Sequence, residues 1–174
     1  MEDITVRAFA PADQDAARRL IIQGLGEHFG FVDEGRNPDL DDIAASYRDG
    51  VFLVALAGDE LIGTGALNPM GRGAVQVVRM STARQRRRQG VGRGILERLL
   101  DEARASGYRW AVLETNAGWE DAIAFYRANA FSVIGRAIGG VAFTYRLSGA
   151  GGRPPLPLAW SFIAQLFWRH FTSR

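Results

Sequence analysis

A glycine-rich, strongly basic segment is the feature that most constrains the fold of this chain. Residues 84–94 read RQRRRQGVGRG, after a valine-rich stretch at 75–80 and before an apolar-periodic stretch at 91–106. The first stretch is typical of a strand and the second of a helix, because its apolar residues recur at helical spacing. A helix N-terminus offers unpaired N–H groups, and glycine lets a ligand approach the backbone closely. The sequence therefore predicts a cradle for a pyrophosphate, or, as the alternative, a solvated basic turn.

Two common phosphate motifs are excluded. No Gly-Lys-Ser/Thr follows the segment, so it is not a P-loop. The third glycine of a dinucleotide fingerprint is missing, and the preceding strand is not the first of the chain.

The rest of the chain predicts a mixed sheet followed by a separate tail. Strands are expected at 4–9, 51–57, 61–67, 75–80, 110–115, 131–134 and 141–147, and helices at 11–29, from 38, at 91–106 and at 119–129. Residues 1–148 form one domain, 149–155 a Gly/Pro linker, and 156–174 an aromatic-rich helix too short to span a bilayer. We expect the tail helix to dock on protein, including a second copy in a homodimer, rather than on a membrane surface.

Composition and charge limit the classes of partner. The first 60 residues hold 13 acids and 5 arginines, whereas residues 61–148 hold 6 acids and 13 arginines. One side of the molecule thus suits an anion and the other a cation. The acidic first third, and the absence of aromatics among the arginines of 84–93, argue against nucleic acid. There is no cysteine and there are two distant histidines, so no metal is expected. The N-terminus lacks a secretion signal, which predicts a cytoplasmic location.

Several segments in order resemble one family. RRQGVG at 87–92 resembles the Arg/Gln-x-x-Gly-x-Gly/Ala signature of the GNAT superfamily of acyl-coenzyme A N-acyltransferases. Residues 77–82 resemble its fourth strand, 113–115 its fifth strand, and 122–131 its Ala-x-x-x-Tyr-x-x-x-Gly-Phe helix. The resemblance implies an α/β (α+β) fold: a mostly antiparallel sheet of about seven strands, with a parallel splayed pair at about 75–82 and 109–115, about four helices and the tail helix.

The resemblance also implies acetyl-coenzyme A as co-substrate, with its pantetheine arm between the splayed strands and no metal. The implied coenzyme contacts are Met80, Ser81, Thr82, Arg87, Arg88, Gln89, Gly90, Val91, Gly92, Arg93 and Asn116. Asn116 is equally well explained as a turn residue that closes its strand.

The implied reaction is direct attack of a primary amine, of a small molecule or a protein, on the acetyl thioester in a ternary complex. A backbone N–H near Met80 would stabilise the oxyanion. Tyr126 would protonate the leaving thiolate, although a tyrosine at this helical spacing can also be a core residue.

The chain departs from the family pattern at two positions. Gln76 stands where many relatives carry a basic glutamate, so the base is left open among water, Glu114 and an amine that arrives neutral. Gln76 is also the support for an alternative function, a non-catalytic acyl-coenzyme A-binding domain. Ala130 replaces the usual glycine, and we expect Asn129 to take the left-handed conformation in its stead.

The first two helices and their loop line the acceptor site in this family. The residues assigned to it here are His28, Phe29, Asp33 and Glu34. Together with Asp39, Asp41 and Asp42 they could form an anionic rim for a cationic amine, although these three aspartates fit helix capping at least as well.

Overall fold

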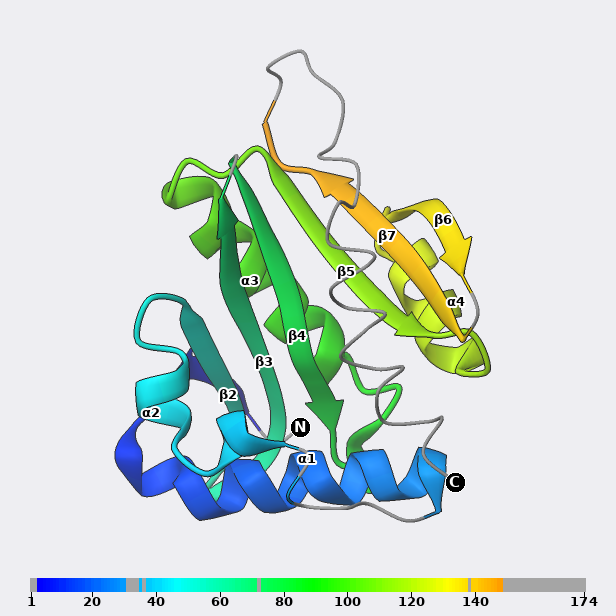
Figure 1. The fold of residues 1–174 in the computed structure, drawn as a ribbon. Helices are drawn as coiled ribbons and strands as arrows, with labels where there is room; N and C mark the ends of the chain where they lie inside the picture. The colour runs from blue at the N-terminus through cyan, green and yellow to red at the C-terminus, as the bar shows by residue number, and fades with distance from the viewer. Residues whose placement is uncertain (1–2, 31–34, 36, 72, 138, 149–174) are drawn as a thin grey trace.

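The computed structural model describes residues 3–30, 35, 37–71, 73–137 and 139–148. The predicted linker at 149–155, the predicted tail helix at 156–174, and Asp33 and Glu34 lie outside the described residues. The described chain forms one seven-stranded sheet in the order β1-β2-β3-β4-β5-β7-β6 (Figure 1).

The strands agree with the predicted segments. They are β1 (Ile4–Ala8), β2 (Val51–Ala57), β3 (Glu60–Gly71), β4 (Ala74–Thr82), β5 (Trp110–Asn116), β6 (Ser132–Ala137) and β7 (Gly140–Arg146). All neighbouring pairs are antiparallel except β4 and β5, which run parallel. The mixed, mostly antiparallel sheet with one parallel pair is therefore confirmed.

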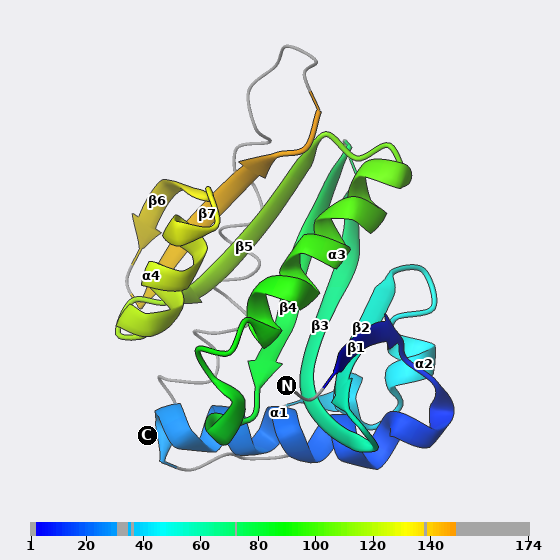
Figure 2. The same cartoon turned by 180° about the vertical axis from the view of Figure 1, so that it is seen from behind.

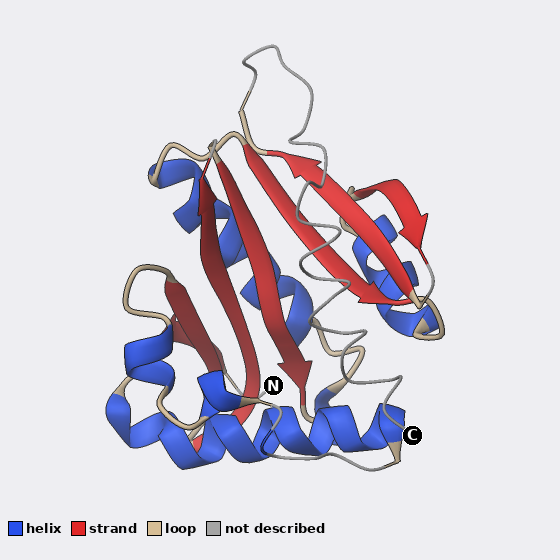
Figure 3. Cartoon of the chain, in the orientation of Figure 1, coloured by secondary structure: helices blue, strands red, loops and turns tan. Residues whose placement is uncertain are grey.

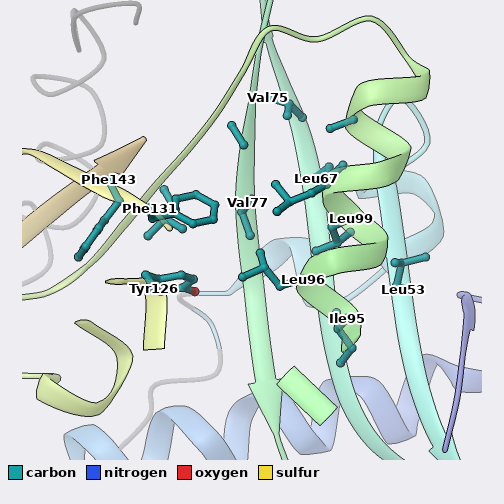
Figure 4. Close-up of a cluster of buried hydrophobic side chains, with 14 of the residues drawn as sticks. Leu53, Leu67, Val75, Val77, Ile95, Leu96, Leu99, Tyr126, Phe131 and Phe143 are labelled. Atoms are coloured by element: carbon teal, nitrogen blue, oxygen red, sulfur yellow. The ribbon is translucent and has the colours of Figure 1, made fainter. Parts of the chain in front are cut away.

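Helices cover both faces of the sheet (Figures 2 and 3). They are α1 (Gln14–Phe29), α2 (Ile43–Ser46), α3 (Val91–Ala105) and α4 (Glu120–Ala128), with 3-10 turns η1 (Pro11–Asp13), η3 (Pro38–Leu40) and η4 (Arg84–Arg86). α3 and α4 pack on one face, where they bury the larger apolar cluster shown in Figure 4. α1, η3 and α2 pack on the opposite face against β2 and β3.

The apolar stripe predicted for the helix after the basic segment is the face that α3 buries. Ile95, Leu96, Leu99, Leu100 and Ala103 are each 5 % exposed or less. β3 accommodates the helix because Gly63 and Gly65 face it without side chains. A Cβ at Gly65 would lie 2.6 Å from Ile95 Cγ2 and 2.7 Å from the Met80 sulfur. The two glycines thus bring the N-terminal half of α3 close to the sheet.

Gly65→Ala is therefore expected to lower the free energy of unfolding by about 1–3 kcal/mol, because the added methyl overpacks the core. Gly24→Ala in α1 is the matched control, since its new Cβ would meet nothing closer than the Ser81 hydroxyl at 3.7 Å. Alanine is the better helix former there and should raise stability by about 0.5–1 kcal/mol. Urea denaturation of both variants measures the difference, and equal stabilities would contradict the packing account.

The end of α4 corrects one expectation. Ala130 itself takes the left-handed conformation, with φ of 63°, whereas Asn129 has φ of −101°. The reason is a Schellman closure: the Phe131 N–H donates to the Tyr126 carbonyl at 3.0 Å, and the Ala130 N–H donates to that of Arg127 at 3.2 Å. This closure requires the left-handed residue at position 130. For an alanine, this left-handed conformation lowers stability by about 1 kcal/mol relative to glycine.

Candidate functional site

An opening between β4 and β5 is the central feature of the site. The two strands pair only where Ala74–Gln76 face residues 110–112. Beyond Gln76, β4 continues to Thr82 and β5 to Asn116, and the two strands diverge (Figure 1). Beyond these pairs the two edges make no ladder hydrogen bonds to each other, and this unpaired stretch is what we call the opening.

The glycine-rich connection lies at the open end of this gap (Figure 2). Gly90 is the N-cap of α3 and has φ of 87°, a conformation that disfavours any other residue. Gly92 lies in the first turn of the helix, where a Cβ would contact Thr82 Oγ1 at 3.4 Å and the Phe125 ring at 3.6 Å. A methyl fits there with little adjustment, but a larger side chain would occupy the approach to the first-turn N–H groups.

Most arginines of the connection already have carboxylate partners. Arg86 pairs with Glu60 at 3.1 Å, Arg93 with Glu97 at 2.8 Å, and Arg87 with Glu27 of α1. Arg88 is exposed, and within the described part of the chain no hydrogen bond or ion pair holds its side chain. Arg84 is also exposed without such a partner among these residues, but Arg88 lies two positions before Gly90, the N-cap of α3, and is therefore the better candidate to meet an anionic ligand there.

Arg88→Ala is expected to weaken acetyl-coenzyme A binding by about 1–3 kcal/mol if the guanidinium meets a phosphate. The left-handed backbone at residue 88, with φ of 62°, does not confound the result, because arginine and alanine disfavour this conformation alike. Arg98→Ala, on the exposed side of α3, removes the same charge without facing the loop. Calorimetric titration should show the loss in Arg88→Ala alone, and equal affinities in the two variants would contradict the assignment.

Tyr126 lies in the core and also near the gap. Its side chain is buried, with ring centroids of Phe131 and Phe143 at 5.7 and 5.8 Å. Its hydroxyl points away from Phe143 toward Leu96 and β4 (Figure 4). It is a buried donor for which no hydrogen-bond partner is found among the described residues. Burial raises the pKa of the Tyr126 phenol, which keeps it protonated at neutral pH.

The side chains of β5 differ in their surroundings. Glu114 is half-buried, and burial raises the pKa of its carboxyl. Asn116 accepts a hydrogen bond from the Gly118 N–H at 2.9 Å through its side-chain oxygen, as a turn residue does. Its amide group is left as a donor. Gln76 lies opposite Val112, in the paired part of the two strands, and precedes the opening.

A β-bulge interrupts β4 at the opening. Ser81 lies opposite Thr64 and Val78 opposite Ala66, so Arg79 and Met80 together face only Gly65 of β3. Arg79 has φ of 53°, and its carbonyl accepts a hydrogen bond from Thr64 Oγ1 at 2.9 Å. Because the peptide unit is planar and trans, the Met80 N–H points away from Thr64.

The Arg79 side chain is a functional candidate that sequence reasoning missed. Its Nε donates to Asp39 Oδ2 at 2.9 Å, a second nitrogen donates to the other Asp39 oxygen, and a third donates to Asn37 Oδ1 at 3.0 Å. The Tyr47 hydroxyl also donates to Asp39 at 2.7 Å. The signal was a charged residue within an otherwise uncharged strand, because a half-buried guanidinium requires a partner.

This cluster bears on two residues of the acceptor side. Asn37 stands at the N-cap position before Pro38, but its side chain binds Arg79 and makes no cap hydrogen bond. Asp39 is paired with Arg79 rather than presented to an amine. Desolvation by burial opposes its ionisation, but the hydrogen bonds and charge of Arg79 outweigh it and lower the pKa of Asp39. Asp42 caps α2 by accepting from the Ala45 N–H at 2.9 Å, as the capping interpretation predicts.

His28 and Phe29 reach across to the far side of the opening. The His28 ring stacks on Trp119 at 4.3 Å between centroids, and Phe29 lies 5.2 Å from the same indole. Trp119 directly precedes α4, so these contacts join the end of α1 to the start of α4. Trp119 is an aromatic wall of the site that local sequence patterns did not reveal.

Two further properties concern the described residues alone. No group of three or more metal-ligating side chains comes together among them. None of their helices is both long and apolar enough to cross a membrane.

Comparison with known proteins identifies the family. Residues 17–131 match the model of the acetyltransferase (GNAT) family. A probable N-acetyltransferase family 8 member 5 of Mus musculus is 34% identical over 113 residues, which is 61% of this chain and 50% of that protein. The matched region thus spans about half the length of that relative.

Solved structures agree on the fold. A GNAT-family acetyltransferase from Staphylococcus aureus superposes with a TM-score of 0.78 at 18% identity, over 84% of this chain and 100% of that one. The PaiA N-acetyltransferase from Thermoplasma acidophilum, solved in complex with coenzyme A, gives 0.73 at 16% identity, over 83% and 99%. With most of its described fold inside the matched region, the chain belongs to the GNAT acetyltransferase family.

Proposed function

We propose that the protein transfers an acetyl group from acetyl-coenzyme A to a primary amine of a small molecule or a protein. The observation that carries this proposal is the opening between β4 and β5, which is bordered by the glycine-rich start of α3 and by the buried hydroxyl of Tyr126. The names of the mouse relative and of the Thermoplasma complex with coenzyme A support it.

The coenzyme would be held mainly by backbone groups. The first-turn N–H groups of α3 have no intrahelical partners, and together with the loop at 87–92 they would face the pyrophosphate, to which Arg88 would add a charge. The edge of β4 at 80–82 would pair with the pantetheine arm as a further strand would. From the end of β5, the Asn116 amide would donate to that arm.

The chemistry requires one new bond and one broken bond. The amine nitrogen attacks the thioester carbonyl carbon, the C–N bond forms, and the C–S bond breaks with its electron pair on sulfur. The Met80 N–H would stabilise the developing oxyanion, and Tyr126 would donate its proton to the thiolate. The nitrogen loses one proton to the base before the attack and a second as the amide forms, and this second proton balances the one that Tyr126 gives to the thiolate.

Glu114 is the candidate base that we favour, because Gln76 has a carboxamide that cannot take a proton. Val112 is the partner of Gln76 in the last pair between the two strands. Glu114 lies two residues further along β5, so its side chain is on the same face of the sheet as that of Val112, at the point where the strands begin to diverge. Water, or an amine that arrives neutral, remains the alternative route for the proton.

Glu114→Gln tests this role through the pH profile. Burial raises the pKa of Glu114, so a base at this position is active above that raised pKa and loses activity as pH falls through it. We expect the variant to lower kcat by on the order of 10²-fold and to remove the acidic limb of kcat/KM. A profile that keeps this limb unchanged would assign the base to another group.

A non-catalytic acyl-coenzyme A-binding domain is the second candidate, and Gln76 is the observation that favours it. Thiol release from acetyl-coenzyme A in the presence of a panel of primary amines separates the two functions. Amine-dependent release supports the enzyme, whereas binding of acetyl-coenzyme A without release supports the binding domain. The cytoplasmic location, the homodimer and the docking of the tail helix stay predictions.

A further inference from the structure

The bulge of β4 is held from outside the strand, by a segment of the acceptor side. Arg79 has a left-handed backbone, which a non-glycine residue keeps only when its surroundings over-determine it. Two groups of contacts hold Arg79 in this conformation. Thr64 binds the Arg79 carbonyl at 2.9 Å, and Asp39 and Asn37 bind the guanidinium through three nitrogens.

The direction of one peptide unit links this anchoring to the chemistry. The Arg79 carbonyl and the Met80 N–H belong to the same planar unit, so the hydrogen bond from Thr64 fixes both. The N–H therefore points opposite to the Thr64 hydroxyl, at a bulge that lies beyond the paired part of β4 and β5. A fork of two hydrogen bonds to a carboxylate also fixes the orientation of the guanidinium, which a single contact would not.

We propose that Arg79, clamped by Asp39, is a positioning residue that aims the Met80 N–H at the carbonyl oxygen of the bound thioester. This inference rests on the proposed acyltransferase function. The proposal gives the segment at 37–39 a role in the reaction, although the Asp39 carboxylate pairs with Arg79 and does not face the substrate. Arg79 acts through the backbone and does not touch the reacting atoms.

The direct test follows the Met80 amide by NMR, with acetyl-coenzyme A and with S-ethyl-coenzyme A as probes. The thioether lacks the carbonyl oxygen but keeps the rest of the coenzyme. We expect the Met80 amide proton of the wild type to shift further downfield with acetyl-coenzyme A than with the thioether. Asp39→Asn should abolish this difference while the amides at 87–92 still respond to both probes.

A matched control separates positioning from general destabilisation. Asp13 forms an equally forked pair with Arg7, at 2.7 and 2.9 Å, at the start of α1, away from the bulge. Asp13→Asn should lower the melting temperature and leave the Met80 shift difference intact. Arg79→Lys keeps the positive charge but cannot make the two hydrogen bonds of the guanidinium to Asp39. It replaces Asp39→Asn in the test if that variant does not fold.

Kinetics give a second readout once an acetylated amine is known. Asp39→Asn and Arg79→Lys should lower kcat by about tenfold or more with little change in KM for acetyl-coenzyme A. A wild-type shift difference retained in both variants would overturn the proposal, as would a wild type whose Met80 amide does not distinguish the probes. If the amides at 87–92 respond to neither probe, the proposed function itself fails.

Discussion

Replacing Gly92 with valine is expected to abolish the rise in melting temperature that acetyl-coenzyme A gives the wild-type protein. A ligand held only by the folded state stabilises it by about 2.7 kcal/mol at a hundredfold excess over Kd. The valine side chain would project beside Thr82 and Phe125, over the first-turn N–H groups of α3. These groups are the predicted contacts of the pyrophosphate, so the ligand would lose its closest approach.

Gly92→Ala is the control for this experiment. Its methyl would meet Thr82 Oγ1 at 3.4 Å, which needs only a small adjustment, and part of the thermal shift should remain. Gly90 is a poorer choice, because any substitution there is strained by its φ of 87°. Scanning fluorimetry of the variants decides the point, and an undiminished shift in Gly92→Val would mean that the coenzyme binds elsewhere.

Tyr126→Phe is expected to lower turnover by on the order of 10²-fold while the affinity for acetyl-coenzyme A holds, because one proton donor is removed. The substitution should not cost stability. The buried hydroxyl has no hydrogen-bond partner among the described residues, and the phenylalanine ring keeps the contacts with Phe131 and Phe143.

Tyr145→Phe is a matched control on β7, where the hydroxyl accepts a hydrogen bond from Arg104 at 3.0 Å instead of facing the gap. It should leave turnover unchanged. Steady-state thiol release with an acetylated amine measures both variants. Full turnover in Tyr126→Phe would restrict Tyr126 to a role in the core.

The predictions from sequence succeeded where local patterns determine structure. The stripe from Ile95 to Ala103 placed α3, because one helical face must be buried. Gly90 marked the start of that helix, because its conformation suits glycine. The order of strand, helix and strand between 75 and 115 indicates a parallel crossover. The splay of that pair came from the resemblance, because local patterns do not show where pairing between β4 and β5 ends.

The predictions failed where a residue meets a partner far along the chain. Asp39 was interpreted as a cap or a rim residue, but its partner Arg79 is 40 positions away. His28 and Trp119 come together only when α1 and α4 flank the gap. At Ala130 the geometry of the helix end outweighed local preference, since the closing hydrogen bonds require a left-handed residue there.

Transfer of a deuterated acetyl group from acetyl-coenzyme A to a panel of primary amines, read by mass spectrometry, tests the central claim most directly. We expect the labelled amide to form with the wild type, to fall to background with Gly92→Val, and to form without labelled protein as an intermediate. Equal product from wild type and Gly92→Val, or no labelled amide from any amine of the panel, would contradict the account.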